Sequence, residues 1–373
     1  MKKVLYGTTA LVAAGVLGTG SAEAQIQLGL GGYMNTFFSV ASIDEASGNP
    51  ADYNATGLWS DGEVHFKGSY KHDNGITFGA EVQLEMFSGG DQIDEKFMFI
   101  SGDFGRLVAG SENSAAYIMH YAAPSVGLPI NSGWVTVFIP PTASHGGLFR
   151  SPGGSTYLDF GNDENVITYY TPRFSGFQLG VTYAPTVNGS GDGKNFPVEA
   201  DTETEYHNGF AAGLNFVEDF NGFGVAVSAG WRYAQASEAA ETLGADDYQA
   251  ISFGGQLSYG GFTVGGSYAN EYDGLYTDFG GGYVVSTEGE SWDVGASYSI
   301  GPWTFGVTYF QGEHEGEITN GDEDEFQALQ GGLNYALGPG ISLGAGVMWA
   351  EYDTEDGAEQ SGIAGAVGLT FSF

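Results

Sequence analysis

Cysteine, basic residues and long apolar runs are all scarce in this chain. None of the 373 residues is cysteine, which excludes disulfide frameworks and thiolate metal sites. Only 10 Lys and Arg stand against 46 Asp and Glu, and this balance excludes non-specific nucleic-acid binding, which needs basic phosphate contacts. Beyond the N-terminus no window of about 20 apolar residues occurs, so the sequence offers no membrane-spanning helix.

The N-terminus has the pattern of a secretory signal peptide. Lys2 and Lys3 precede an apolar stretch over residues 4–17, and residues 22–24 (Ala-Glu-Ala) place small side chains at the cleavage positions. A single membrane anchor is the alternative, but the apolar stretch is too short for one. We expect 1–24 to be a removed signal peptide, which leaves 8 basic and 45 acidic residues and a net charge of −37.

The rest of the chain repeats short segments in which apolar residues alternate with polar or small ones. Phe223, Val225, Val227 and Trp231, for example, are separated by Gly, Ala and Ser. A period of two is typical of a strand with one apolar face, and the small or polar opposite face suits a water-filled interior. Short turns rich in Gly, Asn and Pro separate some of these segments; they lie at 73–75, 102–105, 175–176, 221–222, 260–261, 301–302 and 338–340.

Long acidic connections alternate with these seven short turns. They cover roughly 42–57, 88–92, 113–164, 187–204, 235–247, 272–289, 313–324 and 354–360. Seven short and eight long connections join sixteen strands, and this alternation is typical of a membrane barrel with turns on one side and loops on the other. A soluble sandwich mixes its loop lengths more freely, and a propeller repeats about every 40–45 residues. We therefore predict an all-β fold, a transmembrane antiparallel β-barrel of sixteen strands over 25–373.

The longest connection, 113–164, is the main candidate for a functional segment. It holds five of the eleven prolines and two of the six histidines. A structureless loop of about 50 residues is improbable in a compact domain unless it is functional. We expect it to fold into the lumen of the barrel as a constriction loop.

Charged residues at such a constriction set ion preference. We expect Glu112, Asp159, Asp163 and Glu164 to supply negative charge there, although each could equally be a solvated or turn-capping residue. By alternation the wall cations that face the lumen are Lys67, Lys71, Arg106 and Arg232, an assignment that a one-residue register error would reverse. The excess of acids predicts cation selectivity.

Four features together resemble the general porins of the Gram-negative outer membrane, especially the alphaproteobacterial type. They are the signal peptide, Gly102-Asp103-Phe104-Gly105-Arg106, the long third loop that follows, and a last strand ending in Phe373. The resemblance implies an exported sixteen-stranded homotrimer that lies among outer-membrane lipids and lipopolysaccharide and passes small hydrophilic solutes. Arg106 stands where this family places a wall arginine. The chain departs from the family in having few basic residues to oppose the loop acids, which weakens the transverse field.

Other functions in the same architecture remain open. A channel specific for sugars or carboxylates could use Tyr117, Tyr121, Trp134 and Phe138 as an aromatic slide, and a structural or adhesive barrel could act through its loops. Catalysis is not expected, because the six histidines are dispersed and no nucleophile motif surrounds them. No cofactor is expected; the acidic runs 322–325 and 353–356 could bind calcium weakly, but neither has the spacing of a known calcium cage.

Overall fold

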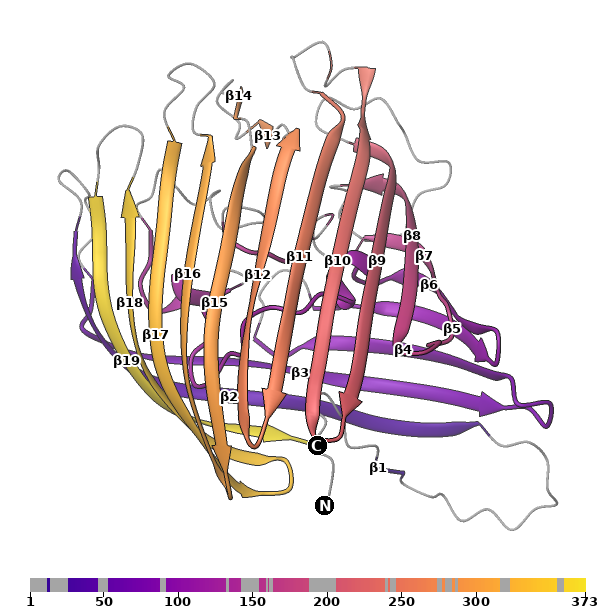
Figure 1. The fold of residues 1–373 in the computed structure, drawn as a ribbon, viewed down its shortest axis with the longest axis horizontal. Coiled ribbons are helices and arrows are strands. Elements are labelled where there is room, and N and C mark those ends of the chain that lie inside the picture. The colour runs from indigo at the N-terminus through magenta and orange to yellow at the C-terminus, as the bar shows by residue number, and fades with distance from the viewer. Residues whose placement is uncertain are drawn as a thin grey trace.

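The architecture is a single sheet of antiparallel strands that closes on itself (Figure 1). The computed structural model describes residues 12–13, 26–45, 53–87, 92–131, 134–141, 154–158, 160, 164–187, 206–238, 241, 246–273, 277–278, 284–285, 288–315, 323–353 and 359–373. Their strands are β1 (Val12–Ala13), β2 (Gln27–Asp44), β3 (Thr56–Lys71), β4 (Thr77–Glu85), β5 (Lys96–Gly102), β6 (Gly105–Ser111), β7 (Asn165–Tyr170), β8 (Phe177–Val187), β9 (Tyr206–Phe220), β10 (Phe223–Ala236), β11 (Tyr248–Tyr259), β12 (Phe262–Asp273), β13 (Thr277–Asp278), β14 (Val284–Val285), β15 (Gly289–Ile300), β16 (Trp303–Glu315), β17 (Glu323–Gly338), β18 (Ile341–Asp353) and β19 (Glu359–Ser372).

Sixteen of these strands, β2–β12 and β15–β19, form the closed ring. Each pairs with the strand before and after it, and the last strand returns to the first, with Ser372 opposite Tyr33 and Ser361 opposite Asp44. Closure leaves no edge strand in the ring, so backbone hydrogen bonds are satisfied without water. The predicted barrel and its strand count are therefore confirmed. Within the predicted signal peptide, β1 adds a short pairing to β2; β13 and β14 pair with each other.

The seven short turns join the strands where the sequence predicts them. At Asn221-Gly222 both central residues have positive φ, 58° and 93°, which matches the right-handed twist of the two flanking strands. Gly260 and Gly261 (56° and 91°) repeat this geometry. The eight longer connections leave the opposite ends of the strands, as the alternation predicts.

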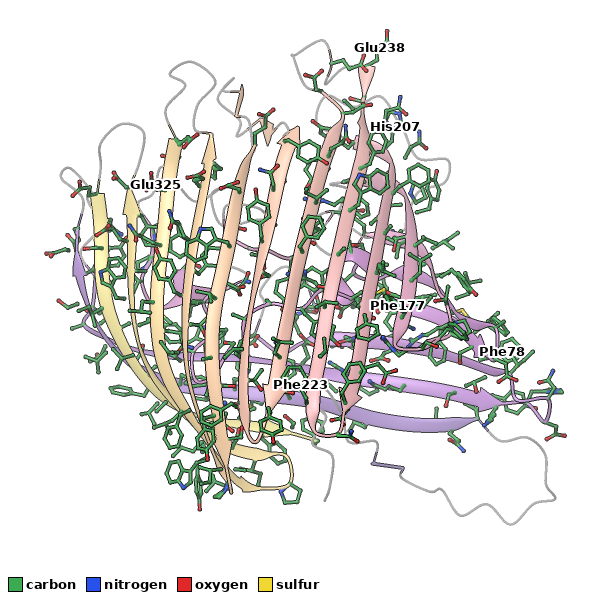
Figure 2. The ribbon with its side chains drawn as sticks, viewed as in Figure 1. Phe78, Phe177, His207, Phe223, Glu238 and Glu325 are labelled. Carbon is green, nitrogen blue, oxygen red and sulfur yellow. The ribbon has the colours of Figure 1, made fainter. Side chains whose placement is uncertain are left out.

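The two faces of the sheet differ in chemistry. Apolar side chains such as Phe66, 52% exposed, stand on one face, and charged or small residues such as Lys67 alternate with them. Figure 2 shows Phe78, Phe177 and Phe223 toward the end with short turns, and Glu238 and Glu325 near the end where the long connections begin. The exposed apolar face forms a belt around the barrel, which is the surface that lipid requires.

The long third connection contains two short helical segments, α1 (Ala115–Ile118) and the 3-10 turn η1 (Trp134–Val137). Across the part of the chain that the structure describes, no helix is long and apolar enough to cross a membrane.

Candidate functional site: the third connection and the wall it contacts

The third connection begins and ends at one narrow neck. Ser111 pairs with Asn165 at the ends of β6 and β7, and the backbone N–H of Glu112 donates to the carbonyl of Glu164 at 3.3 Å. The first turn of α1 follows at once because Ser114 caps it, accepting from the Tyr117 N–H at 3.3 Å. The two ends of the segment are thus held together beside Arg106.

From this neck, residues 113–131 and 134–141 run along the sheet face opposite the apolar belt. Five strands of the wall each form a hydrogen bond with the segment. The bonds join Ala115 N to Thr182 Oγ1 on β8 (2.9 Å), Tyr121 N to Ser228 Oγ on β10 (2.9 Å), Gln256 Nε2 on β11 to Ala122 O (2.8 Å), Thr308 Oγ1 on β16 to Pro124 O (2.9 Å) and Gln360 Nε2 on β19 to Pro140 O (2.6 Å).

Small wall residues let the segment approach this closely. A Cβ on Gly254 would overlap the Tyr121 carbonyl, and one on Gly332 would overlap the Val126 carbonyl. Around these points the segment packs in two buried apolar clusters. One includes Leu158 and Phe160 with wall alanines such as Ala234 and Ala250; the other includes Leu128, Ile130, Phe138 and Ile139 with Met348 and Ala350. The segment and the wall are therefore held together by buried apolar contacts like those of a protein core.

Asp293 on β15 joins two distant parts of the segment to the wall. It is 3% exposed and accepts from the Ala123 N–H (3.1 and 3.2 Å), from Asn131 Nδ2 (2.9 Å) and from Ser267 Oγ (2.6 Å). Asn131 and Ser267 each bond in turn to Thr156 Oγ1 at 2.7 Å. We call Asp293, Ala123, Asn131, Thr156 and Ser267 the Asp293 latch, because it ties 120–131 and 154–158 to the same wall carboxylate.

Beside the neck lies an acidic cluster formed by Glu63 on β3, Glu81 on β4, Asp94 and Glu95 just before β5, and Glu112 just after β6. The carboxylates of Glu63, Asp94 and Glu95 lie within 4.8 Å of one another. His65 Nε2 lies 2.7 Å from Glu63, and Lys67 Nζ lies 2.8 Å from Glu81. The Lys67 ammonium offsets one of these negative charges.

The pKa of Glu112 depends on its burial and on the charges around it. Burial raises the pKa of its carboxyl to about 7, against the lowering effect of the Asn113 N–H and the Arg106 charge; Glu81 and Asp94 raise it further. Arg106 itself lies over the Phe99 ring at 4.4 Å from guanidinium carbon to ring centroid. The structure therefore places Glu112 and Glu164 at the neck, Arg106 within electrostatic reach of Glu112, and Lys67 in an ion pair with Glu81.

The remaining predicted site residues lie elsewhere. Arg232 is on the face that alternation predicts but is 1% exposed, under the Tyr248 ring (4.2 Å) and 3.4 Å from Glu271. Lys71 is exposed at the short-turn end of β3. Asp159 and Asp163 lie outside the described residues.

Sequence reasoning missed the latch and Arg173. Arg173 donates to Gly176 O (2.6 Å), Gln178 (2.9 Å) and Asn215 (2.8 Å) at a short turn. The available signal for the covered wall was alanine, and not a polar residue, on the inner face, as at Ala234, Ala250 and Ala350, where the structure packs the segment against them.

A family model described as Gram-negative porin matches residues 7–355. The chain belongs to the Gram-negative porin family. It is therefore a channel of the outer membrane through which small solutes pass by diffusion, and it is not an enzyme.

Solved porins share its fold. A porin refined at 1.8 Å resolution has 18% identity and a TM-score of 0.60, covering 93% of this chain and 100% of its own. An anion-selective porin from Comamonas acidovorans has 15% identity and a TM-score of 0.59, covering 94% and 100%. OmpT of Vibrio cholerae in a trimer form has 14% identity and a TM-score of 0.56, covering 93% and 99%. At such identities the likeness shows the fold alone. A search of curated proteins found no match.

Proposed function

We propose that this porin is cation-selective and that its third connection, 113–164, lies in the lumen and narrows it. The acidic cluster beside the neck carries the proposal. Five carboxylates gather there, and the basic residues near them are Lys67, Lys96, Arg106 and His65. A surplus of negative charge at a constriction attracts cations and repels anions.

Reversal potentials across a planar bilayer in a salt gradient test the selectivity. The wild type is expected to prefer cations, and Glu81→Gln combined with Glu95→Gln should lower the cation-to-anion permeability ratio. Asp73→Asn combined with Asp103→Asn, at the exposed β3–β4 and β5–β6 turns, likewise removes two negative charges, but away from the cluster, and serves as control. Anion preference in the wild type would end the proposal. An equal effect of the control would show that the overall charge of the protein, and not the cluster, sets the selectivity.

General diffusion is favoured over a sugar-specific channel. Phe138, one of four aromatic residues proposed for a slide, is 5% exposed and packs against Trp59 on β3 at 5.9 Å. Tyr117 pairs with Tyr157 at 5.1 Å. The Trp134 side chain lies outside the described residues. An aromatic side chain packed against the wall offers no face for a sugar, and liposome swelling with sugars of graded size should show dependence on size and not on stereochemistry.

We also propose that the protein is exported with loss of its N-terminal segment and that it assembles as a homotrimer. Residues 1–24 are expected to be absent from the mature protein, which N-terminal sequencing of outer-membrane material tests. A homotrimer is supported by the OmpT trimer among the similar structures, and the mobility of unheated, detergent-extracted protein tests it. Contact with outer-membrane lipids and lipopolysaccharide follows from the apolar belt.

Weak calcium binding at the acidic runs stays a prediction. Glu325 of the first run lies directly opposite Asp353 of the second, across β17 and β18, while 322 and 354–356 lie outside the described residues. Calorimetric titration with Ca²⁺ tests it, and no heat at millimolar calcium refutes it.

A further inference from the structure

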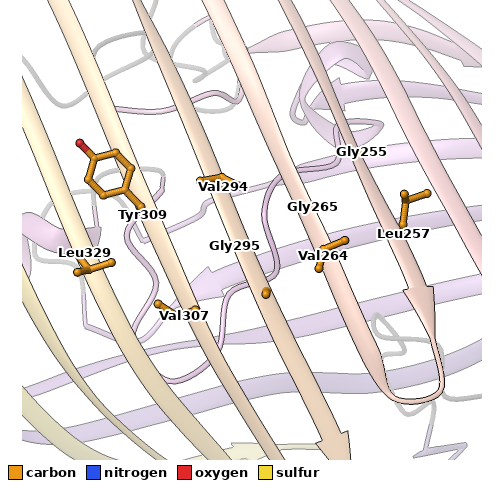
Figure 3. A pocket seen from close by; sticks show the side chains of 10 residues that line it. Gly255, Leu257, Val264, Gly265, Val294, Gly295, Val307, Tyr309 and Leu329 are labelled. Atoms are coloured by element: carbon orange, nitrogen blue, oxygen red, sulfur yellow. The ribbon is translucent and has the colours of Figure 1, made fainter.

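The third connection covers one sector of the inner wall and leaves another to the acidic cluster. Its hydrogen bonds and apolar contacts begin at β8 and continue past β19 to Trp59 on β3. Figure 3 looks onto the outward face of β11 to β17 and shows the connection crossing behind these strands; there a Cβ on Gly295 would lie 3.2 Å from the Cβ of Ala123. The remaining sector, β3 to β6 and the residues beside them, holds the acidic cluster. With the connection in the lumen, a solute passes between it and this acidic sector.

The side of the connection that is turned away from the wall is uncharged and partly apolar. Between residues 113 and 160, none of the described residues is Asp, Glu, Lys or Arg. The two alanines of α1 and its C-cap Met119 are buried against the wall, whereas Ile118 is 48% exposed. Val137 is 42% exposed, although the next two residues are buried. Exposed aliphatic side chains in a water-filled bore keep their unfavourable contact with water until a solute covers them.

These two exposed side chains flank the acidic sector. Ile118 lies six residues after Glu112, and half of these steps have the short helical rise, so the two Cα atoms are at most about 15 Å apart. The ring that follows Val137 lies 5.9 Å from the ring of Trp59, which precedes Glu63 by four residues on β3. Strand residues an even number apart share a face. The exposed valine therefore approaches the acidic sector from the β3 side, and the isoleucine from the neck.

We propose that the channel discriminates among cations of equal charge and size and passes those with an apolar group best. This preference rests on the proposed function, which supplies the selectivity for cations and the place of the connection in the lumen. An alkylammonium ion can set its ammonium group against the acidic cluster and its hydrocarbon chain against Ile118 or Val137. That contact removes apolar surface from water on both partners. A polar ion of the same size loses hydration at this edge and gains no hydrogen bond from either side chain.

Bi-ionic reversal potentials across a planar bilayer, measured on the full chain as extracted from the outer membrane, test this preference. The probes are n-butylammonium and 2-methoxyethylammonium, which have the same charge and nearly the same size because an ether oxygen replaces one methylene group. The wild type should pass butylammonium about threefold better. Full burial of a methylene group would give more, but a solute between the connection and the wall stays partly in contact with water.

Two double variants locate the preference. Ile118→Gln combined with Val137→Thr should abolish the difference between the two ammonium ions and leave the preference for K⁺ over Cl⁻ unchanged, since neither substitution alters charge. Ile300→Gln combined with Val264→Thr makes the same two changes at exposed positions of the outward face and should keep the wild-type ratio.

The possible failures are distinguishable. Equal passage of the two ammonium ions by a wild type that prefers K⁺ over Cl⁻ overturns the preference for apolar cations and leaves the proposed function standing. A wild type that prefers Cl⁻ overturns both. A wild-type ratio in the variant with Ile118→Gln and Val137→Thr overturns the part assigned to the connection, as does an equal loss in the outward-face control.

Discussion

Replacing Asp293 with alanine should loosen the third connection from the wall. The carboxylate accepts hydrogen bonds from Ala123, Asn131 and Ser267 in a site that is 3% exposed. Asn131 and Ser267 each keep a second bond, to Thr156. The Ala123 N–H has no other acceptor among the hydrogen bonds of the described residues, so it bears most of the loss.

The size of the effect follows from these partners. A hydrogen bond to a charged group contributes about 1.5–3 kcal/mol, and a buried donor left unsatisfied costs about 1–3 kcal/mol. Relief of the buried charge offsets part of this, and the two donors that keep Thr156 lose less. We expect a net loss of about 2–4 kcal/mol in the attachment of the segment. Since about 1.4 kcal/mol is tenfold, the detached fraction should rise roughly 30- to 700-fold.

Single-channel recording in a planar bilayer measures this fraction. Asp293→Ala should show more frequent conductance fluctuations than the wild type and admit larger sugars in liposome swelling. Asp293→Asn keeps an oxygen acceptor and should fall between the two. Asp219→Ala, which loses a carboxylate at the β9–β10 turn where it caps the Gly222 N–H, controls for charge. Quiet, unaltered currents in Asp293→Ala would refute the reasoning.

Three further predictions concern the same segment. Because the pKa of Glu112 is about 7, its ionised fraction rises from roughly a tenth at pH 6 to roughly nine tenths at pH 8. Reversal potentials should therefore show a cation preference that grows over this pH range. The same pH dependence of the reversal potential in Glu112→Gln would contradict this. Burial lowers the pKa of His120 to about 4. Between pH 4 and pH 6.5 the unfolded chain binds a proton at this residue that the folded chain does not. The contribution of His120 to the free energy of unfolding is therefore complete above pH 6.5 and falls by up to about 3 kcal/mol as the pH drops to 4. The denaturation temperature should depend less steeply on pH in His120→Gln than in the wild type, and the same pH dependence in both proteins would contradict this. Gly254→Ala should lower heat stability by displacing Tyr121, whereas Gly331→Ala, on β17 with nothing within 4 Å of an added Cβ, should cost little; equal losses in the two variants contradict the close approach.

The barrel wall was predictable from sequence because its determinants are local. Alternation with a period of two fixes which face of each strand is apolar, and the Asn-Gly and Gly-Gly turns fix where strands reverse. The strand count, the placement of seven turns and eight long connections, and the face of Lys67, Arg106 and Arg232 all follow from residues close together in the chain.

The attachment of the third connection was not predictable in this way. Asp293 lies 170 residues from Ala123 and 162 from Asn131. No local sequence pattern around either stretch indicates that the two come into contact. The same holds for a row of acids that become neighbours only when five strands pair in one register: Glu290, Glu313, Glu325, Asp353 and Glu359. Arg232 shows the limit most clearly: alternation gave its direction, but only the packing of Phe160 and Tyr248 over it decided that it is buried. Sequence alone determined the wall, because period and turn chemistry are short-range; the tertiary structure decided which wall residues the third connection contacts, because ring closure brings distant strands beside the same segment.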